Sequence, residues 1–106
     1  MEEADMVIRM RIYQTNGPDR VADDVFYRLV KPVHERHGAC FMGRYIDMKG
    51  RHVVMWSYND LEDMAAIQER VANDEETIRS RPIRLKSGLH GVPFEEFIME
   101  STDPEG

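Results

Sequence analysis

Hydrophobic and polar residues alternate along the stretch MVIRMRIYQT, at positions 6–15. Successive side chains of a strand point to opposite faces, so a period of two over this length predicts a first strand. One set of alternate positions is apolar, and the other carries Arg9, Arg11 and Tyr13. The NGPD that follows, at positions 16–19, predicts a turn, because Asn and Gly tolerate unusual dihedral angles and Pro fixes its own.

The period then changes to that of a helix over positions 19–37. Apolar residues recur there at helical spacing, at Val21, Val25, Phe26, Leu29, Val30 and Val33. Such a stripe predicts a helix with one buried face. Pro32 has no amide proton for a helical hydrogen bond, so we expect a kink there. Gly38 is the predicted stop at the C-terminal end.

Two strand-like runs follow, at 39–48 and 51–58, joined by Lys49-Gly50. A two-residue loop predicts an antiparallel hairpin. Counted outward from that loop, the register pairs Gly43 with Trp56, where a residue without a side chain leaves room for the indole.

This register places the aromatic residues of the hairpin on one face and Arg44 on the other, so Arg44 and the aromatic set should not share a pocket. The set consists of Phe41, Tyr45, Trp56 and Tyr58. Aromatic stripes on strands usually belong to a core. In a small α+β domain, however, the space between sheet and helices is also the place for a cavity. We therefore interpret these residues as core first and pocket wall second.

A second helical region begins after the hairpin, where Asn59 or Asp60 is the expected cap. Its predicted inner stripe is Leu61, Met64, Ala65, Gln68 and Val71. Positions 74–81 suggest a second helical piece, which Pro82 is expected to interrupt. A final strand is predicted at 94–101.

The resulting order, β-α-β-β-α-β, predicts an α+β ferredoxin-like fold, with a four-stranded antiparallel sheet and two helices on one face. We expect one domain over residues 6–101, with tails at 1–5 and 102–106. Both faces of the middle strands carry large apolar side chains, while the helices cover only one face. A homodimer through the sheet face is therefore expected.

The charge balance limits the partners of this chain. Its 14 Lys and Arg against 20 Asp and Glu give a formal net charge of -6. Nucleic acid and anionic membranes both favour basic surfaces, so neither is an expected partner. Cys40, the one cysteine, cannot form an intramolecular disulfide and is expected to be a buried, inert thiol. We expect a cytoplasmic protein, since the N-terminus does not look like a signal peptide.

Four short motifs stand in order along the chain: Arg11-Ile12-Tyr13, then Pro32-Val33-His34 with Gly38, then Gly43, and finally Trp56-Ser57-Tyr58 with Asp60-Leu61. In this order and spacing they resemble the NIPSNAP family, within the dimeric α/β-barrel superfamily. The resemblance covers roughly residues 7 to 100. It implies the ferredoxin-like fold and a dimer. It does not imply one reaction, because the superfamily also includes cofactor-independent antibiotic-biosynthesis monooxygenases and haem-degrading oxygenases, and NIPSNAP-like bacterial proteins mostly have no assigned reaction.

The chain departs from the family pattern in the second helical region. Family members commonly carry a tryptophan shortly after an acidic pair there, whereas this chain has Asp74-Glu75-Glu76-Thr77. The difference removes a large side chain near the helices and changes the expected shape of the pocket.

His34 and His37 are the histidines of the first helix, three positions apart. Two imidazoles are one ligand short of a typical catalytic zinc site, so no metal is expected. The simpler interpretation is a pair of partly protonated histidines that stabilise the C-terminal end of the helix. If one of them has a chemical role, His34 is favoured, because it matches the family position and the kink at Pro32 can direct it toward the sheet. A neutral imidazole there could act as a general base.

Arg11 and Tyr13 share one strand face, and such a pair suits an anionic or phenolate ligand. The segment RSRPIRLK, at 79–86, concentrates four basic residues in an acidic chain. A solvated basic patch is its simplest interpretation, and a phosphate or carboxylate contact at the pocket mouth is the alternative.

Two functions of different class remain open. In the first, the protein is a cofactor-independent enzyme on an aromatic or polyketide-like small molecule, of monooxygenase, isomerase or cyclase type. His34 and Arg11 would then be catalytic, and substrate would lie against Tyr13, Phe41, Tyr45, Trp56 and Tyr58. In the second, the protein is a non-catalytic small-molecule-binding or accessory dimer. No cofactor is expected in either case.

Overall fold

The computed structural model describes residues 6–14 and 19–102. Its elements follow one another in the order β1 (Val7–Tyr13), α1 (Arg20–Val25), η1 (Phe26–Val30), α2 (Lys31–Arg36), β2 (Cys40–Ile46), β3 (His52–Tyr58), α3 (Leu61–Ala72), α4 (Glu75–Lys86) and β4 (Phe94–Glu100). The predicted order of strands and helical regions is confirmed.

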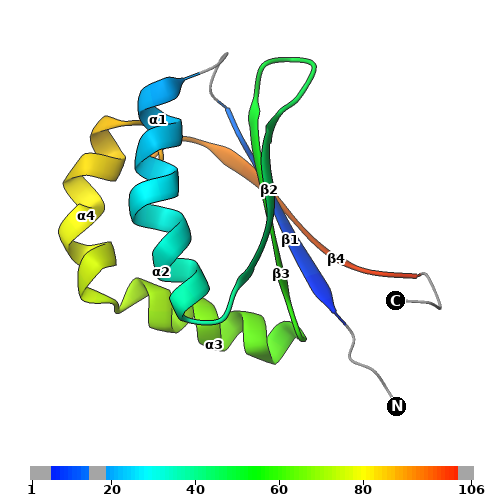
Figure 1. Cartoon of the computed structure of the whole chain (residues 1–106). Coiled ribbons are helices and arrows are strands. Elements are labelled where there is room, and N and C mark those ends of the chain that lie inside the picture. Colours follow the sequence, from blue (N-terminus) through cyan, green and yellow to red (C-terminus); the bar gives the residue numbers. More distant parts are fainter. Residues whose placement is uncertain (1–5, 15–18, 103–106) are drawn as a thin grey trace.

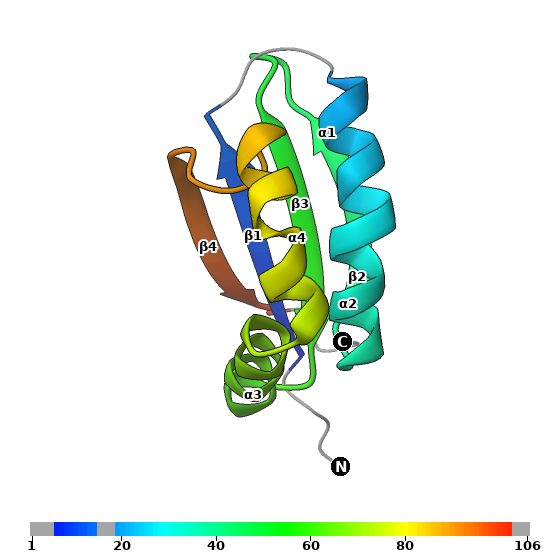
Figure 2. The ribbon, with the colours of Figure 1, turned by 90° about the vertical axis from the view of Figure 1, so that its left-hand side faces the viewer.

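The four strands form one antiparallel sheet in the order β2-β3-β1-β4. The helices lie along one face of this sheet, as Figures 1 and 2 show from two directions. No described helix covers the opposite face (Figure 1). This is the α+β ferredoxin-like fold that the hydrophobic pattern predicted.

The alternation along β1 assigns its side chains to the two faces correctly. Arg9, Arg11 and Tyr13 point to the helix-covered face, where all three line a cavity described below. The apolar residues between them, such as Met10, point to the bare face. The two faces of this central strand are thus chemically different, polar toward the helices and apolar on the uncovered side.

The predicted register of the hairpin is wrong by one residue along most of β2. Phe41 pairs with Trp56 but Gly43 pairs with Met55, so Met42 is an extra residue in a β-bulge. Gly43 has a φ of +145°, a conformation that side chains disfavour, which is why a glycine suits this irregular point.

The bulge reverses the face of every residue between it and the loop. Arg44, predicted to face away from the aromatic residues, lies with Trp56 on the helix-covered side. Tyr45 turns to the bare face and is 54% exposed. The connection is also longer than two residues, since β2 ends at Ile46 and β3 begins at His52.

The first helical region is one helix interrupted by a π-helical turn. Asp19 caps its start, accepting hydrogen bonds from the amides of Val21 and Ala22. Residues of η1 then form the π turn just before Pro32, where the amide of Lys31 bonds to the carbonyl of Phe26. A wider turn gives the proline ring room in a place where a regular helix would clash. The expected irregularity at Pro32 is confirmed.

The second helical region differs from its prediction in two respects. Asp60 caps α3 as expected, but Leu61 and Ala65 face solvent, and the buried positions include Ile67. The helix α4 continues through Pro82 instead of ending there. Ile78, whose carbonyl would accept the missing hydrogen bond, lies with Pro82 on the exposed side, where water can satisfy that carbonyl.

The hydrophobic core lies between the helices and the covered face of the sheet. Its buried members are Phe26, Val33, Ala39, Val54, Trp56, Tyr58, Ile67 and Val71.

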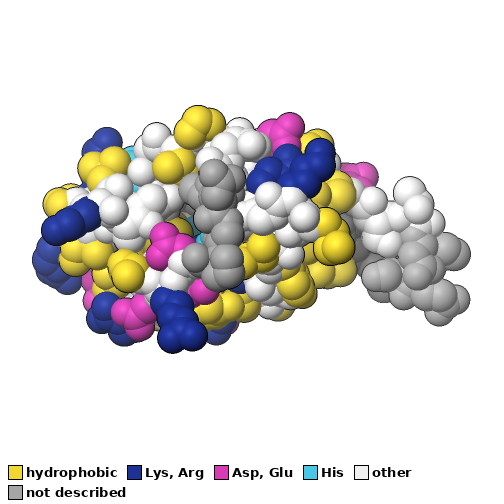
Figure 3. Space-filling model, turned by 90° about the horizontal axis from the view of Figure 1, so that it is seen from above, with side chains coloured by type: hydrophobic (Ala, Val, Ile, Leu, Met, Phe, Trp, Pro, Cys, Tyr) yellow, Lys and Arg dark blue, Asp and Glu magenta, His cyan; other side chains and the backbone are white. Residues whose placement is uncertain are grey.

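Cys40 is exposed, so the expectation of a buried thiol is wrong. No helix in the described part of the chain is long and apolar enough to cross a membrane. Seen from above, basic side chains are interspersed with acidic and apolar ones over the described surface (Figure 3).

Candidate functional site

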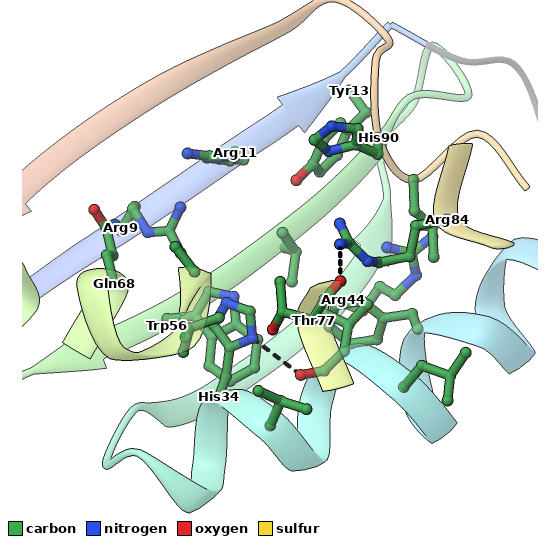
Figure 4. Close-up of a pocket in the computed structure, with 18 residues that line it drawn as sticks. Arg9, Arg11, Tyr13, His34, Arg44, Trp56, Gln68, Thr77, Arg84 and His90 are labelled. Atoms are coloured by element: carbon green, nitrogen blue, oxygen red, sulfur yellow. Dashed lines mark hydrogen bonds between the residues drawn. The ribbon is translucent and has the colours of Figure 1, made fainter. Parts of the chain in front are cut away.

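A cavity of about 250 Å³ lies between the helix-covered face of the sheet and the helices. Strands supply one wall and helices the other, and the loop between α4 and β4 contributes Leu89 and His90 (Figure 4). The lining mixes apolar side chains with a polar set, which consists of Arg9, Arg11, Tyr13, His34, Arg44, Gln68, Thr77, Arg84 and His90. No described acidic residue lines the cavity.

His34 projects from α2 onto the indole of Trp56. The two rings are stacked, with centroids 4.6 Å apart and planes 17° from parallel. His34 Nδ1 lies 2.9 Å from the carbonyl oxygen of Val30. A carbonyl oxygen can only accept, so Nδ1 carries the proton and Nε2 has a free lone pair. These two contacts fix both the tautomer and the orientation of the ring.

Nε2 of His34 has no hydrogen bond to the described residues. Among the described residues, every side-chain nitrogen or oxygen that is fully buried has a hydrogen-bond partner. Because Nε2 has no such partner, it is not fully buried. Nε2 is therefore reachable from the cavity that His34 lines. Burial, and to a smaller extent the charges of Arg9, Arg11 and Arg84, lower the pKa of His34 to about 4. The ring is neutral at physiological pH, so the interpretation of His34 as a protonated helix-end residue is wrong.

Two of the cavity arginines come from β1 and share one carboxylate. Arg9 is only 4% exposed and donates to the Tyr58 hydroxyl at 3.2 and 3.3 Å. It also lies 3.5 Å from Glu96 of β4, which accepts a hydrogen bond from Arg11 as well. The Arg11 guanidinium stacks over the ring of Phe94, 4.3 Å from its centroid. The pair is thus held rigidly at the edge of the cavity.

The other two cavity arginines come from opposite walls. Arg44 of β2 donates to Asp23 of α1 at 2.9 Å and lies over the ring of Phe26. Arg84 of α4 donates to the Ser80 hydroxyl at 3.0 Å. No salt bridge joins Arg84 to a carboxylate of the described residues, in contrast to the other three.

The structure brings together four of the seven residues predicted to form the site. Arg11, Tyr13, His34 and Trp56 line the cavity. Phe41 lies behind them, packed against Trp56 with centroids 5.1 Å apart, and Tyr58 holds Arg9 from within the core. Tyr45 lies on the bare face and does not belong to the cavity.

Five further residues line the cavity, and three of them, Arg9, Thr77 and His90, were not predicted at the site. The other two were predicted only in general terms, Gln68 on the inner stripe of its helix and Arg84 within the basic segment 79–86. A signal was available for Arg9, since it shares the strand face of Arg11 and Tyr13. His90 stands in a segment without periodicity, and Arg84 follows a proline that was expected to end its helix.

His34 and His37 do not form a metal site. His34 bonds to Val30 inside the fold, whereas His37 Nε2 lies 2.8 Å from a carboxylate oxygen of Asp74 at the start of α4. No group of three or more His, Cys, Asp or Glu side chains in the described residues is arranged to hold a metal ion.

Comparison with known proteins gives matches at the level of structure. No protein-family model matches the chain, and no curated protein matches it in sequence. A crystal structure of a NIPSNAP family protein from Agrobacterium tumefaciens superposes with a TM-score of 0.79, at 18% identity, over 98% of this chain and 92% of that one. This chain has the NIPSNAP fold.

Two further solved structures extend this result. A NIPSNAP domain protein from Burkholderia xenovorans gives a TM-score of 0.73 at 19% identity, over 88% of this chain and 91% of that one. A protein from Nitrosomonas europaea, named provisionally as an antibiotic biosynthesis monooxygenase, gives 0.58 at 15% identity, over 100% and 99%. The resemblance that the motifs indicated is confirmed for the NIPSNAP fold. At these identities the likeness establishes the fold and no reaction.

Proposed function

We propose that this protein is a small-molecule enzyme in which His34 is a general base. The observation that carries the proposal is the fixed tautomer of His34, whose Nδ1 is bonded to Val30 while Nε2 is open to an arginine-lined cavity. Histidine is the side chain that most often moves protons in enzymes, and it must be neutral to accept one. The stacking on Trp56 holds the ring in one orientation, which general-base catalysis requires.

The chemistry begins when Nε2 accepts a proton from an acidic C–H or O–H group of the substrate. The electron pair left behind is delocalised onto a substrate oxygen as an enolate or phenolate, and Arg11 stabilises that negative charge. Return of the proton to a different carbon completes an isomerisation. Attack of the carbanion on a carbonyl of the same molecule forms a ring and an alkoxide, and the alkoxide takes the proton back from Nε2 to complete a cyclisation. A monooxygenase reaction additionally needs O₂ as a second substrate: one oxygen atom enters the product, the other leaves as water, and the organic substrate supplies the electrons.

The size of the cavity narrows the substrate class. Its volume of about 250 Å³ lies just below the roughly 300–1,000 Å³ of typical ligand pockets. We therefore favour a substrate with one aromatic or enolic ring over a fused multi-ring polyketide. The fold shared with the Nitrosomonas protein supports such small-molecule chemistry by analogy.

One observation favours the second candidate, a non-catalytic small-molecule-binding or accessory protein. A pKa of about 4 makes His34 a weak base in the free protein. For His34 to be effective in catalysis, the bound substrate must raise this pKa. The two candidates therefore differ in whether a ligand only fills the cavity or also exchanges a proton with Nε2.

Solvent deuterium exchange separates the two candidates. The purified protein is incubated in D₂O with a panel of single-ring phenols and ring-bearing enolisable ketones, and mass spectrometry detects deuterium at carbon. We expect exchange into at least one compound, and its loss in His34→Gln. His37→Gln is the matched control, since His37 caps the C-terminal end of the helix that carries His34 but contacts Asp74 outside the cavity. Exchange that persists in His34→Gln would remove the base role.

We also propose that the protein is a homodimer through the bare face of the sheet. That face carries apolar side chains on all four strands, at Ile8, Met10, Ile12, Tyr45, Val53, Met55, Phe97 and Met99. An uncovered apolar surface of this extent favours association with a second copy.

A further inference from the structure

The charges around the cavity do not balance. Glu96 is shared by Arg9 and Arg11, and Asp23 pairs with Arg44. Arg84 has no carboxylate partner among the described residues. The cavity wall therefore carries more positive than negative charge, although the chain as a whole is acidic. Uncompensated positive charge in a partly dry site is stabilised by a bound anion.

Arg84 is held in place while most of its hydrogen-bonding capacity stays free. Its Nε donates to the Ser80 hydroxyl at 3.0 Å, and one terminal nitrogen donates to the Thr77 carbonyl at 2.6 Å. A guanidinium has five N–H donors, so three remain for a ligand. Ser80 lies one turn and Thr77 two turns before Arg84 on α4, so the guanidinium is anchored to its own helix (Figure 4).

Burial and neighbouring positive charge around Arg84 favour the binding of an anion there. Burial, together with the charge of Arg81, lowers the pKa of Arg84 below its ordinary value. His90 lies close by in the cavity lining, and burial and the charges of Arg84 and Arg81 lower its pKa as well. A neutral imidazole adds a hydrogen-bonding group beside Arg84 without adding negative charge. Tyr13 also lines the cavity and offers a hydroxyl.

We propose that the substrate is an aromatic carboxylate, with its carboxylate bound by Arg84 and its ring directed toward His34 and Trp56. Arg84, His34 and Trp56 line the same cavity, and the charge of Arg84 acts on the pKa of His34, so one ligand in this cavity is placed to contact both ends (Figure 4). Guanidinium binds carboxylate through two parallel hydrogen bonds, which adds geometric selection to the attraction of charge. The sequence left open a carboxylate contact from the basic segment 79–86, and we assign this contact to Arg84.

The bound carboxylate also bears on catalysis, and this second step rests on the proposed function. The charges of Arg9, Arg11 and Arg84 each lower the pKa of His34. A carboxylate on Arg84 offsets part of that positive field, so His34 becomes a stronger base when the correct ligand is present. An uncharged analogue would fill the same space without this effect. The anion is thus needed for proton transfer as well as for binding.

The test compares benzoate with benzamide, which share a shape but differ in charge. Trp56 is the one tryptophan of the chain and lines the cavity, so its fluorescence reports on this site alone. Binding is measured in the wild type, Arg84→Gln, Arg84→Lys and Arg81→Gln, with melting curves to verify folding. Arg81→Gln is the matched control, since it removes a charge from the same helix at an exposed position outside the lining.

We expect benzoate to bind the wild type more tightly than benzamide by roughly tenfold to a hundredfold, the effect of a charge-assisted hydrogen bond. Arg84→Gln should abolish this preference, Arg84→Lys should keep part of it, and Arg81→Gln should keep most of it. Three results would overturn the proposal: equal binding of the two compounds, a preference that survives in Arg84→Gln, or no benzoate binding at tens of millimolar.

The same measurement in His34→Gln separates this proposal from the base role. If His34→Gln binds benzoate with the full preference while deuterium exchange is absent from the wild type, the carboxylate site stands and the enzymatic function fails.

Discussion

Replacing His34 by glutamine should flatten the dependence of stability on pH. The wild-type ring is buried against Trp56, and its Nδ1–H is bonded to Val30. Protonation would place a charge on Nε2 beside the arginines of the cavity. Glutamine preserves a polar side chain but cannot take up a proton in this range, so the difference between the two proteins isolates one titration.

The magnitude follows from the pKa of His34, which is about 4 in the folded protein against an ordinary value of 6.5. As the pH falls below 6.5, the unfolded chain binds a proton at this site that the folded protein does not bind until about pH 4. The unfolded state then holds more protons, so the free energy of unfolding decreases as the pH falls through this window. At about 1.36 kcal/mol per pKa unit, the full loss is about 3 kcal/mol.

Urea unfolding, followed by Trp56 fluorescence at a series of pH values between about 7 and about 4, measures this loss. Carboxylates titrate in the same range in both proteins and cancel in the comparison. The wild type should lose about 3 kcal/mol more than His34→Gln across the window. Parallel curves for the two proteins would refute the burial of a neutral His34 and, with it, the fixed tautomer.

Three further predictions concern the fold and the assembly. Ile67→Ala should lower the free energy of unfolding by about 2–5 kcal/mol, because Ile67 is 1% exposed in the core, and urea titration measures the loss. Gly43→Ala should cost about 1–3 kcal/mol, since the bulge needs a φ of +145° and a Cβ there would meet Tyr45; a neutral result would mean that the bulge is not held as described. Met10→Glu should convert the proposed dimer into a monomer in sedimentation, because Met10 and its partner Met55 lie at the centre of the bare face; a wild type that sediments as a monomer would contradict the proposed assembly.

The faces of β1 were predictable because one period of two ran unbroken through the strand. That pattern alone placed Arg11 and Tyr13 together on one face, and the structure shows that this face meets the helices. The register of β2 was not predictable in the same way, because the extra residue at Met42 shifts every later position by one. As a result Arg44, which was predicted to lie away from the pocket, lines the cavity, whereas Tyr45, which was predicted to line it, lies on the bare face.

The π-helical turn before Pro32 was predictable only as an irregularity. The proline indicated where the predicted helix departs from regular geometry, but only the structure shows that the irregularity is a π-helical turn at Phe26–Val30. Pro82 has no π-helical turn before it, and α4 runs through it as one α-helix. Arg84 was therefore predicted only as one of the basic residues of the segment 79–86, because a helix expected to break at Pro82 gave no direction for the side chains beyond it. The place of Arg84 in the cavity wall depends on tertiary packing, which the local sequence does not show.

The proposed chemistry requires that a neutral His34 and an arginine-lined anion site act on the same ligand. NMR titration of the His34 Hε1 proton, with and without saturating benzoate, tests both parts together. We expect His34 to have a pKa of about 4 in the free protein and a higher pKa in the complex, because the carboxylate offsets the charge of Arg84. A pKa near 6.5 in the free protein, or one that benzoate leaves unchanged, would contradict it.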